Sequence, residues 1–419
     1  MPGMALFKRL EMDPKVIAAS MVDNVRFSRY VIYILLEIAG AFIVYNMVLA
    51  LIQWTRTLAC LNNDNQQYFR AQHPIYAWAQ RNILLAPLFR QRHSERIYVG
   101  PVTVGFLPTR FQSTLILGIV IMNVTLATYG IEWHGSEVKL LWHFRNRLGI
   151  LALTNMIPLV LIAGRNNPLI FLTRISYSDF NLMHRWFGRL VIALAIAHGS
   201  VEFYYMDTLA QKMHESSWKA FGDFLREERF LLYGFIAFLS MLCILLTSFS
   251  PLRHAFYETF LHLHIALVAL ILASLWIHLA NIPSQTLVKA IIALWAIERL
   301  LRLSTLLYRN IGANPTRATI EVLPGDAMRV TVRIARPWPV QPGQHVYLTL
   351  PTIGLWTSHP FSVAWSSDTT TPTIPPNHSF LDLAPDTEKG LPPLPPPPPP
   401  LPPLSANKQS SSSSAPAQA

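Results

Sequence analysis

Charged residues are scarce in this sequence, because Asp, Glu, Lys and Arg together make up 14% of its 419 residues. A soluble domain carries about 25% charged residues, and here the deficit is concentrated in long uncharged runs. This composition excludes an ordinary soluble protein and predicts a polytopic membrane protein. The net charge of +11 comes from basic residues in loops beside apolar stretches, where membrane orientation explains them. We therefore expect no nucleic-acid partner.

Cysteine is scarce as well. The chain has two cysteines, Cys60 and Cys243, and Cys243 lies inside an apolar stretch, which excludes a disulfide framework. The N-terminus also lacks a basic start followed at once by an apolar run and a small-residue cleavage site. We expect no cleaved signal peptide, and the first membrane span should act as the targeting signal.

Apolar stretches are abundant by contrast. A helix needs about 20 apolar residues to cross a bilayer core, and seven stretches qualify: 30–52, 112–130, 149–164, 182–206, 231–250, 256–280 and 285–304. They predict an all-α polytopic membrane bundle in which residues 112–304 form a six-span core. An N-terminal segment (1–29), an additional first helix (30–52) and a cytosolic loop (53–111) precede this core.

The orientation of the spans follows from the basic residues, which accumulate in cytosolic loops. The loop between the first two spans is rich in arginine, and Arg165, Arg174 and Arg253 lie in later loops on the same side. With seven spans, the N-terminus lies outside and the C-terminus lies in the cytosol. We expect an integral membrane protein in contact with lipid, in the plasma membrane or, as the alternative, in the vacuolar membrane.

The pattern changes after the last span. Residues 315–366 alternate apolar and polar side chains between glycine and proline breaks, which is typical of short strands and turns. Residues 367–419 are rich in Thr, Pro and Ser and include LPPLPPPPPPLPPL at 391–404, which predicts a disordered tail with polyproline II character. One interpretation of this tail is a docking site for SH3- or WW-like modules. The other is a solvated linker or the end of a shortened chain.

Two apolar stretches begin and end on histidine: HRWFGRLVIALAIAH (184–198) and HIALVALILASLWIH (264–278). An α-helix has 3.6 residues per turn, so 14 residues make almost four turns and place both histidines of a stretch on one face, about 21 Å apart. The stretches are the fourth and sixth spans, which run in the same direction. They predict two levels of facing imidazoles, His184 with His264 and His198 with His278.

A neutral imidazole is an iron ligand, and two facing imidazoles suit a b-type haem. Two levels would hold two haems and carry electrons through a dielectric that ions do not cross. For any single histidine, the alternatives are a hydrogen bond to a neighbour or the lining of a cavity. A histidine proton channel is a third alternative, but it requires no matched spacing. His262 is two residues before His264 on a different face, so we interpret it as a non-ligand.

The paired histidines, followed by a β-domain with the motif HPFS, resemble the ferric reductases and the related superoxide-producing NADPH oxidases. The fungal ferric/cupric-chelate reductases are the more similar group, and the additional first span fits them. Three segments are similar to that group: RLGILALTNMIPLVLIAGRNNPL (147–169), SYSDFNLMHRWFGR (176–189) and FYETFLHLHIALVAL (256–270). The resemblance covers residues 30–366.

The resemblance implies four haem ligands, one pair for an inner haem and one for an outer haem: His184 with His264, and His198 with His278. It assigns the HPFS motif to flavin binding, in an antiparallel β-barrel of flavin-reductase type: His359, Pro360, Phe361 and Ser362. In the family, electrons pass from NADPH to FAD, to two haem b groups, and then to outside ferric or cupric chelates such as siderophores. The implied role is metal uptake, with a high-affinity iron uptake system as partner. No catalytic residue is expected beyond the haem ligands.

The sequence departs from the family pattern after Trp365. The family continues through the flavin barrel into a nucleotide-binding lobe, whose Gly-rich loop binds a pyrophosphate, and this sequence has no such loop. It provides only part of an FAD site, in residues 315–366, and no NADPH site, which suggests a chain cut short within a low-complexity insertion. Two alternatives to metal reduction follow: a superoxide-producing NADPH oxidase, and a truncated, non-catalytic haem protein without its own electron input.

Overall fold

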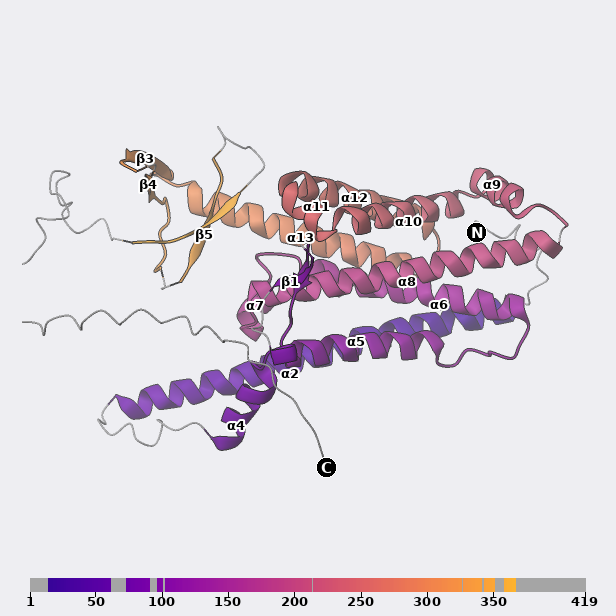
Figure 1. Ribbon diagram of the computed structural model, residues 1–419, viewed down its shortest axis with the longest axis horizontal. Coiled ribbons are helices and arrows are strands. Elements are labelled where there is room, and N and C mark those ends of the chain that lie inside the picture. The colour runs from indigo at the N-terminus through magenta and orange to yellow at the C-terminus, as the bar shows by residue number, and fades with distance from the viewer. Residues whose placement is uncertain are drawn as a thin grey trace, which may run out of the picture. The chain divides into compact units, whose positions relative to one another are not determined.

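The computed structural model describes residues 14–61, 73–90, 96–100, 102–212, 214–325, 327–340, 343–350 and 358–366. The predicted disordered tail (367–419) lies outside these ranges, as do residues 1–13 of the predicted N-terminal segment. The described residues are mostly helical with a few antiparallel strands, which confirms the predicted fold class (Figure 1). The chain divides into two compact units between Trp338 and Pro339.

Long helices occupy all seven stretches that were predicted to span the membrane: α2 (Pro14–Cys60), α5 (Arg110–Thr128), α6 (Glu137–Leu161), α8 (Tyr177–Lys212), α10 (Arg229–Thr247), α12 (Tyr257–His278) and α13 (Gln285–Asn310). Among the described residues, five helices are long and apolar enough to cross a membrane: α2, α5, α8, α10 and α12. The predicted number of seven spans is therefore too high by this measure. Charged residues interrupt the other two, for example Arg145 and Arg147 in α6 and Glu298 and Arg299 in α13.

Short helices connect the long ones: α4 (Pro74–Ala79), α7 (Pro168–Thr173), α9 (Ser217–Glu227) and α11 (Ser250–Ala255). Local sequence explains where several helices begin. A capping box starts α5, because the Thr109 hydroxyl accepts from the Gln112 amide at 3.2 Å and the Gln112 side chain accepts from the Thr109 amide at 2.9 Å. The Asn167 side chain caps α7, and Pro168 occupies the first position of that helix.

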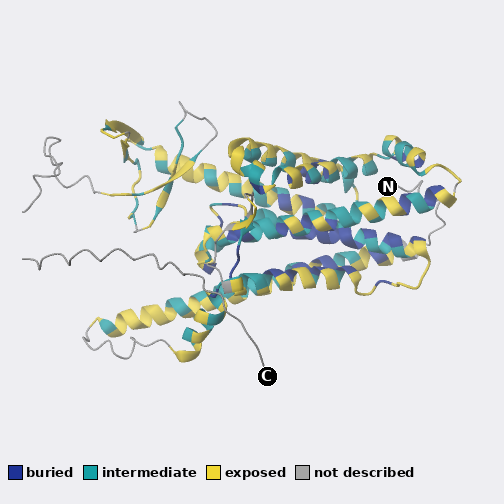
Figure 2. Cartoon of the chain, in the orientation of Figure 1, coloured by how far each residue is buried: buried dark blue, intermediate teal, exposed yellow. Residues whose placement is uncertain are grey.

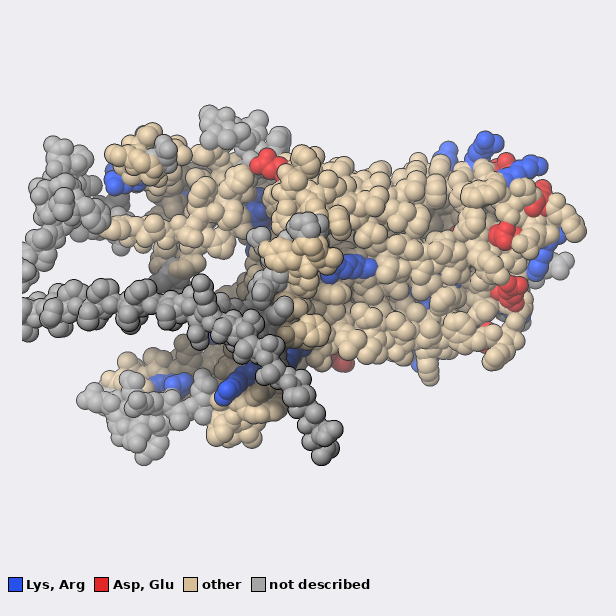
Figure 3. Space-filling view, viewed as in Figure 1, with Lys and Arg blue, Asp and Glu red and all other residues tan. Residues whose placement is uncertain are grey.

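Helix α6 lies at the centre of the bundle. It packs along α8 and also contacts α2, α5 and α13, and Figure 2 shows buried residues along much of its length. Its side chains join apolar residues of α8, α10, α12 and α13 in the main core, which includes Ile150, Leu153, Met156, Val191, Met241, Ile244, Ile271, Leu272, Val288 and Ile291. Figure 3 shows charged side chains gathered near α9 at one end of the bundle, and the adjoining surface is mostly uncharged.

Helix α2 is longer than the predicted span 30–52. It has 47 residues, or about 70 Å at 1.5 Å per residue, more than the roughly 30 Å of a bilayer core. Phe27 packs against Tyr129 after the end of α5, with ring centroids 6.4 Å apart, and Phe42 packs against Phe111 at the start of α5, with centroids 5.9 Å apart. The part of α2 after Phe42 extends past α5, and α4 lies beside it (Figure 1).

The predicted cytosolic loop 53–111 contains regular structure. Besides the end of α2 and helix α4, it includes a two-stranded antiparallel sheet of β1 (Arg96–Val99) and β2 (Val102–Phe106). Gly100 adopts a positive φ of 62° in the turn between these strands, a conformation that glycine adopts without steric cost. The sequence analysis did not anticipate this hairpin, although a Gly-Pro pair between two apolar runs is a turn pattern.

The C-terminal strands form two pairs. In the first unit, β3 (Arg317–Leu323) pairs with β4 (Ala327–Arg333), and in the second unit β5 (His345–Leu348) pairs with β6 (His359–Ser362). Both pairs are antiparallel, as predicted. In the described residues they are separate two-stranded sheets, so the partial β-barrel stays a prediction.

Candidate functional site

The four histidines predicted to bind haem lie on two helices, and the structure brings them together in two pairs. His184 and His198 lie on α8, and His264 and His278 lie on α12. The ring centroids of His184 and His264 are 6.4 Å apart and their planes meet at 74°. His198 is close enough to His278 for a charge on one ring to act on the other. We call His184 and His264 the inner level, and His198 and His278 the outer level.

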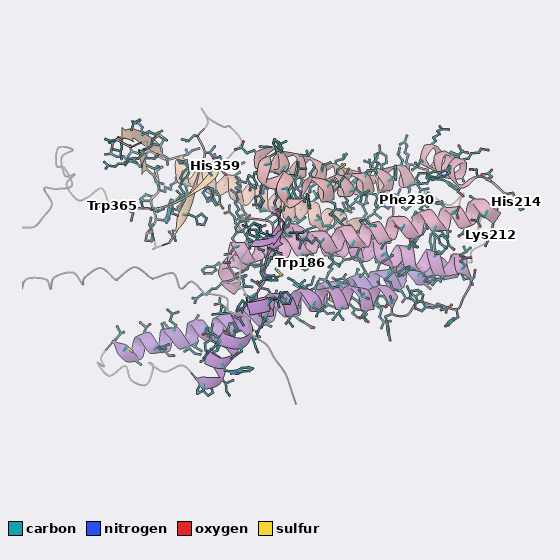
Figure 4. The ribbon with its side chains drawn as sticks, in the orientation of Figure 1. Trp186, Lys212, His214, Phe230, His359 and Trp365 are labelled. Carbon is teal, nitrogen blue, oxygen red and sulfur yellow. The ribbon has the colours of Figure 1, made fainter. Side chains whose placement is uncertain are left out.

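The two levels lie at different depths of the bundle. Trp186 follows His184 by two residues, and Phe230 stacks on His278 with ring centroids 4.2 Å apart and planes 23° apart. Figure 4 labels both residues and shows them at different positions along the bundle. About 21 Å along α8 separates its two histidines, at 1.5 Å per residue. Helices α8 and α12 run in the same direction, as the sequence predicts.

Three of the four imidazoles donate a hydrogen bond from Nδ1 to a backbone carbonyl on a neighbouring helix. His184 donates to Leu159 at 2.9 Å, His198 to Arg145 at 2.7 Å, and His278 to Phe230 at 2.7 Å. A carbonyl oxygen only accepts, so Nδ1 carries the proton and Nε2 of the neutral ring keeps its lone pair. A histidine that binds a metal is usually held in this way through its other nitrogen.

Two backbone carbonyls of α6 have the same spacing along the chain as the two histidines of α8, but in the opposite order. Arg145 and Leu159 have the same separation in the sequence as His184 and His198. The earlier carbonyl accepts from the later histidine, so α6 runs antiparallel to α8 and passes both levels. Helix α6 is too polar to qualify as a span by composition, yet it runs beside α8 over the depth of both levels.

His264 differs from the other three histidines. Its Nδ1 is buried and has no hydrogen-bond partner among the described residues. The ring contacts Phe260, one turn earlier on α12, with centroids 5.5 Å apart and planes 40° apart. The ring packs against Phe260 and His184. His262, which we interpreted as a non-ligand, bonds to the Glu258 carbonyl of its own helix at 2.8 Å.

A buried ion pair lies next to the outer level. Arg145, whose carbonyl binds His198, places its Nη1 2.5 Å from a carboxylate oxygen of Glu202 on α8, and these side chains are 6% and 18% exposed. The guanidinium also lies 4.2 Å from the ring centroid of Trp142 and 4.3 Å from that of Tyr205. The charges are therefore paired and the cation is enclosed by two aromatic faces, as burial of a charge requires.

The predicted flavin residues form strand β6 in the second unit: His359, Pro360, Phe361 and Ser362. They are exposed and pair with β5, His345 opposite Ser362 and Leu348 opposite His359. Gly343 precedes β5 with a positive φ of 82°, a conformation that glycine adopts without steric cost.

Sequence reasoning missed the residues that hold the imidazoles. The acceptors of His184, His198 and His278 are backbone atoms, so no side-chain type in the sequence indicates them. The ring of Phe230 gave no sign either, because an aromatic residue at the start of an apolar helix is ordinary. Only the repeated histidine spacing identified the helices that carry the rings.

Comparison with known protein families gives two matches. Residues 148–275 match the family described as "Ferric reductase like transmembrane component", and residues 313–373 match an FAD-binding domain. The first match contains three of the four histidines and ends three residues before His278. The second match contains β6.

Curated proteins of fungi are similar over most of the chain. It is 30% identical to "Ferric reductase transmembrane component 3" of Saccharomyces cerevisiae over 296 residues, which are 68% of this chain and 39% of that protein. It is 28% identical to "Ferric/cupric reductase transmembrane component 2" of the same yeast over 323 residues, 75% of this chain and 43% of the relative. The chain thus spans about two fifths of these relatives. With its apolar helices, this similarity identifies an integral membrane protein.

Proposed function

Because this chain belongs to the fungal ferric reductase family, we propose that it carries electrons across a membrane to reduce Fe(III) or Cu(II) chelates on the extracytosolic side. Two b-type haems would form the path, with His184 and His264 as ligands of the inner haem and His198 and His278 as ligands of the outer haem. The observation that carries the proposal is the pairing of these imidazoles at two depths.

The donor set fits a haem better than a bare metal ion. Among the described residues, no group of three or more His, Cys, Asp or Glu side chains could hold a metal ion. Each level instead offers two imidazoles, and these two side chains would hold a haem that each level could bind. A metal–imidazole bond is about 2 Å long, so two rings that share one metal have centres roughly 6 Å apart. The inner pair, at 6.4 Å, is compatible with this.

The protein positions the ligands. When bound, the two haems supply one-electron carriers at two depths of the membrane. The carbonyls of Leu159, Arg145 and Phe230 hold the proton of each ring on Nδ1 and direct Nε2 to the opposite side. Outer-sphere reduction of a chelate needs no protein acid or base, so we assign no catalytic residue beyond the four ligands.

The electron input enters from the C-terminal side in this proposal. The FAD-binding match includes β6, and we assign its four residues to flavin binding, as the family resemblance implies. NADPH would be the electron donor of the whole protein. The donor, the flavin and the metal chelate are all part of the proposal, since the chain spans about two fifths of its relatives.

The proposed topology places the inner level toward the cytosol. We propose that α6 and α13 cross the membrane with the five helices that qualify by composition. Helix α6 passes both histidine levels, and α13 packs against α6 in the main core. The N-terminus then lies outside and the C-terminus in the cytosol, in the plasma membrane. Ferric or cupric chelates such as siderophores would meet the outer level, and a high-affinity iron uptake system would take up the reduced metal.

The first experiment is the visible spectrum of membranes that contain the full 419-residue chain. Reduction with dithionite should give a b-type difference spectrum, and a variant with both His198→Ala and His264→Ala should lose it. His262→Ala is the matched control, because its ring bonds within its own helix, and it should keep the spectrum. Absence of a b-type spectrum from the wild type would contradict the haem assignment.

A second set of measurements addresses the donor and the acceptor. NADPH alone should leave the haems oxidised in this preparation, because the 419-residue chain contains no Gly-rich pyrophosphate loop. After chemical reduction, a ferric chelate added outside should reoxidise the haems. Reoxidation by oxygen with release of superoxide, and none by the ferric chelate, would favour the oxidase alternative.

A further inference from the structure

Two glycines lie directly against the imidazoles of the outer level. A Cβ atom built on Gly234 of α10 would lie 2.7 Å from both Cε1 and Nδ1 of His278. A Cβ atom on Gly149 of α6 would lie 3.0 Å from Cε1 and 3.1 Å from Nδ1 of His198. Carbon atoms in contact are normally about 3.5–4.0 Å apart, so any larger residue would push the ring away.

Each glycine follows the carbonyl that holds the same ring by four residues. Phe230 accepts from His278 and precedes Gly234 on α10, and Arg145 accepts from His198 and precedes Gly149 on α6. Residues i and i+4 lie on the same face of a helix. Two different helices therefore present the same arrangement, a carbonyl acceptor and a glycine one turn later, to the two outer rings.

The inner level lacks this arrangement. The residue four positions after Leu159, the acceptor of His184, is Ala163. On α8 itself, a Cβ on Gly188 would meet only a Leu159 methyl carbon at 3.8 Å, an ordinary contact distance. His264 has no carbonyl partner for its Nδ1 in the part of the chain that the structure describes. Within that part, the close approach of a glycine to a ligand ring is therefore specific to the outer level.

We propose that Gly149 and Gly234 are positioning residues of the outer haem. The missing Cβ lets the backbones of α6 and α10 approach the imidazoles closely enough for the short bonds of 2.7 Å. The glycine and the carbonyl together fix the plane of each ring and the direction of its Nε2. This inference rests on the proposed function, because it assumes that the four histidines bind haem.

The test replaces each glycine by alanine in the full chain, in membranes. Gly234→Ala and Gly149→Ala are the test variants. Gly118→Ala on α5 and Gly40→Ala on α2 are matched controls, because each adds the same methyl group to a long apolar helix and a Cβ there meets nothing within 4 Å. The readouts are haem per chain from the dithionite difference spectrum and the low-temperature EPR signals of the two ferric haems, which depend on the ligand-ring planes.

We expect wild type and controls to contain two haems with two ferric signals. Gly234→Ala should lose the outer haem, which halves the absorbance per chain, or keep it with a shifted signal. Gly149→Ala should change the outer-haem signal less, because its clash is milder. If Gly234→Ala does not reach the membrane, Gly149→Ala alone tests the inference. The inner signal should stay unchanged in both.

Two results would overturn the inference while leaving the haem assignment intact. One is a two-haem wild-type spectrum that neither variant changes in amount or ferric signal. The other is an equal change at both haems, which would show that the glycines serve the packing of the whole bundle. A wild type without any b-type spectrum would overturn the proposed function, and this inference with it.

Discussion

The outer and inner levels hold their histidines in different ways. At the outer level, both rings donate to a carbonyl of a neighbouring helix at 2.7 Å, and a glycine lies against each ring. At the inner level, His184 makes one such bond at 2.9 Å, and Nδ1 of His264 has no hydrogen-bond partner within the described ranges. The same two helices, α8 and α12, thus carry an outer imidazole pair that carbonyls of α6 and α10 hold, and an inner pair in which one ring has no such carbonyl.

The surrounding helices also contact the two levels differently. Helix α6 contacts both levels, but in the described structure α10 contributes a carbonyl acceptor only to the outer level. The outer level also lies beside the buried Arg145–Glu202 pair, which joins α6 to α8. The rings nearest the proposed extracytosolic acceptor therefore have more backbone contacts than the inner rings. Each of these contacts can be tested separately.

Removing one ligand should break one level and spare the other, and this is the largest effect that we expect. His278→Ala should remove the outer haem and His264→Ala the inner haem, so each variant keeps about half of the b-type absorbance per chain, because each haem has its own pair of ligands. The measurement is the haem content of each purified variant. Complete loss of haem from either single variant would contradict independent levels.

The ion pair beside the outer level should have the next largest effect. Glu202→Gln removes the partner of a cation that is 6% exposed, and breaking a buried pair in this way costs about 3–5 kcal/mol of unfolding free energy. Asp223→Asn is the control: its pair with Arg226 has an N–O distance of 3.9 Å, and the Arg226 side chain is 84% exposed. Such a surface pair contributes about 0–1 kcal/mol.

Thermal unfolding of the purified proteins measures both changes. Adding Arg145→Met to Glu202→Gln should recover much of the loss, because the unpaired charge is removed while the carbonyl that binds His198 is kept. Equal losses of thermal stability in Glu202→Gln and Asp223→Asn would show that the buried pair contributes no more to stability than the surface pair.

The ring of Phe230 offers a smaller test. Phe230→Leu keeps the carbonyl that binds His278 but removes a stacked contact at 4.2 Å and 23°. Aromatic contacts of this kind contribute about 0.5–1.5 kcal/mol beyond burial. Phe260→Leu is the equivalent change at the inner level, where the rings are 5.5 Å apart and tilted by 40°, and its effect should be smaller. A larger loss of thermal stability in Phe260→Leu would reverse our ranking of the levels.

The sequence predicted the helices, the facing histidines and the C-terminal strands because each has a repeating pattern: apolar runs, a matched histidine spacing, and alternation. It did not predict that α6 begins at Glu137, well before the predicted span 149–164. Arg145 and Arg147 lie just before that span, and tertiary contacts bury both. Arg145 pairs with Glu202, and Arg147 donates to Asn24, Leu126 and Tyr129. Such partners lie far away in the chain, so local composition does not indicate them.

The glycines that contact the imidazoles were not predictable from the sequence either. Gly149, Gly188 and Gly234 are equally visible in the sequence, and each lies in one of the predicted apolar stretches. Only the packing distinguishes them, because two of the three lie against an imidazole of a neighbouring helix. Backbone acceptors and missing side chains carry no residue-type pattern, so sequence reasoning identified the ligands but not the groups that orient them.

Gly188→Ala should have the smallest effect on stability. Gly234→Ala should lower the unfolding free energy through its clash with His278, whereas Gly188→Ala should raise it. The added methyl group would meet a Leu159 carbon at 3.8 Å, which is an ordinary contact. Alanine also restricts the unfolded chain and favours the helix, so we expect a gain of about 0.4–1 kcal/mol in unfolding free energy. The melting temperature should rise slightly and both ferric signals should keep their positions. A loss of the inner haem in this variant would show that the inner level is as tightly enclosed as the outer one, and the contrast between the two levels would fail.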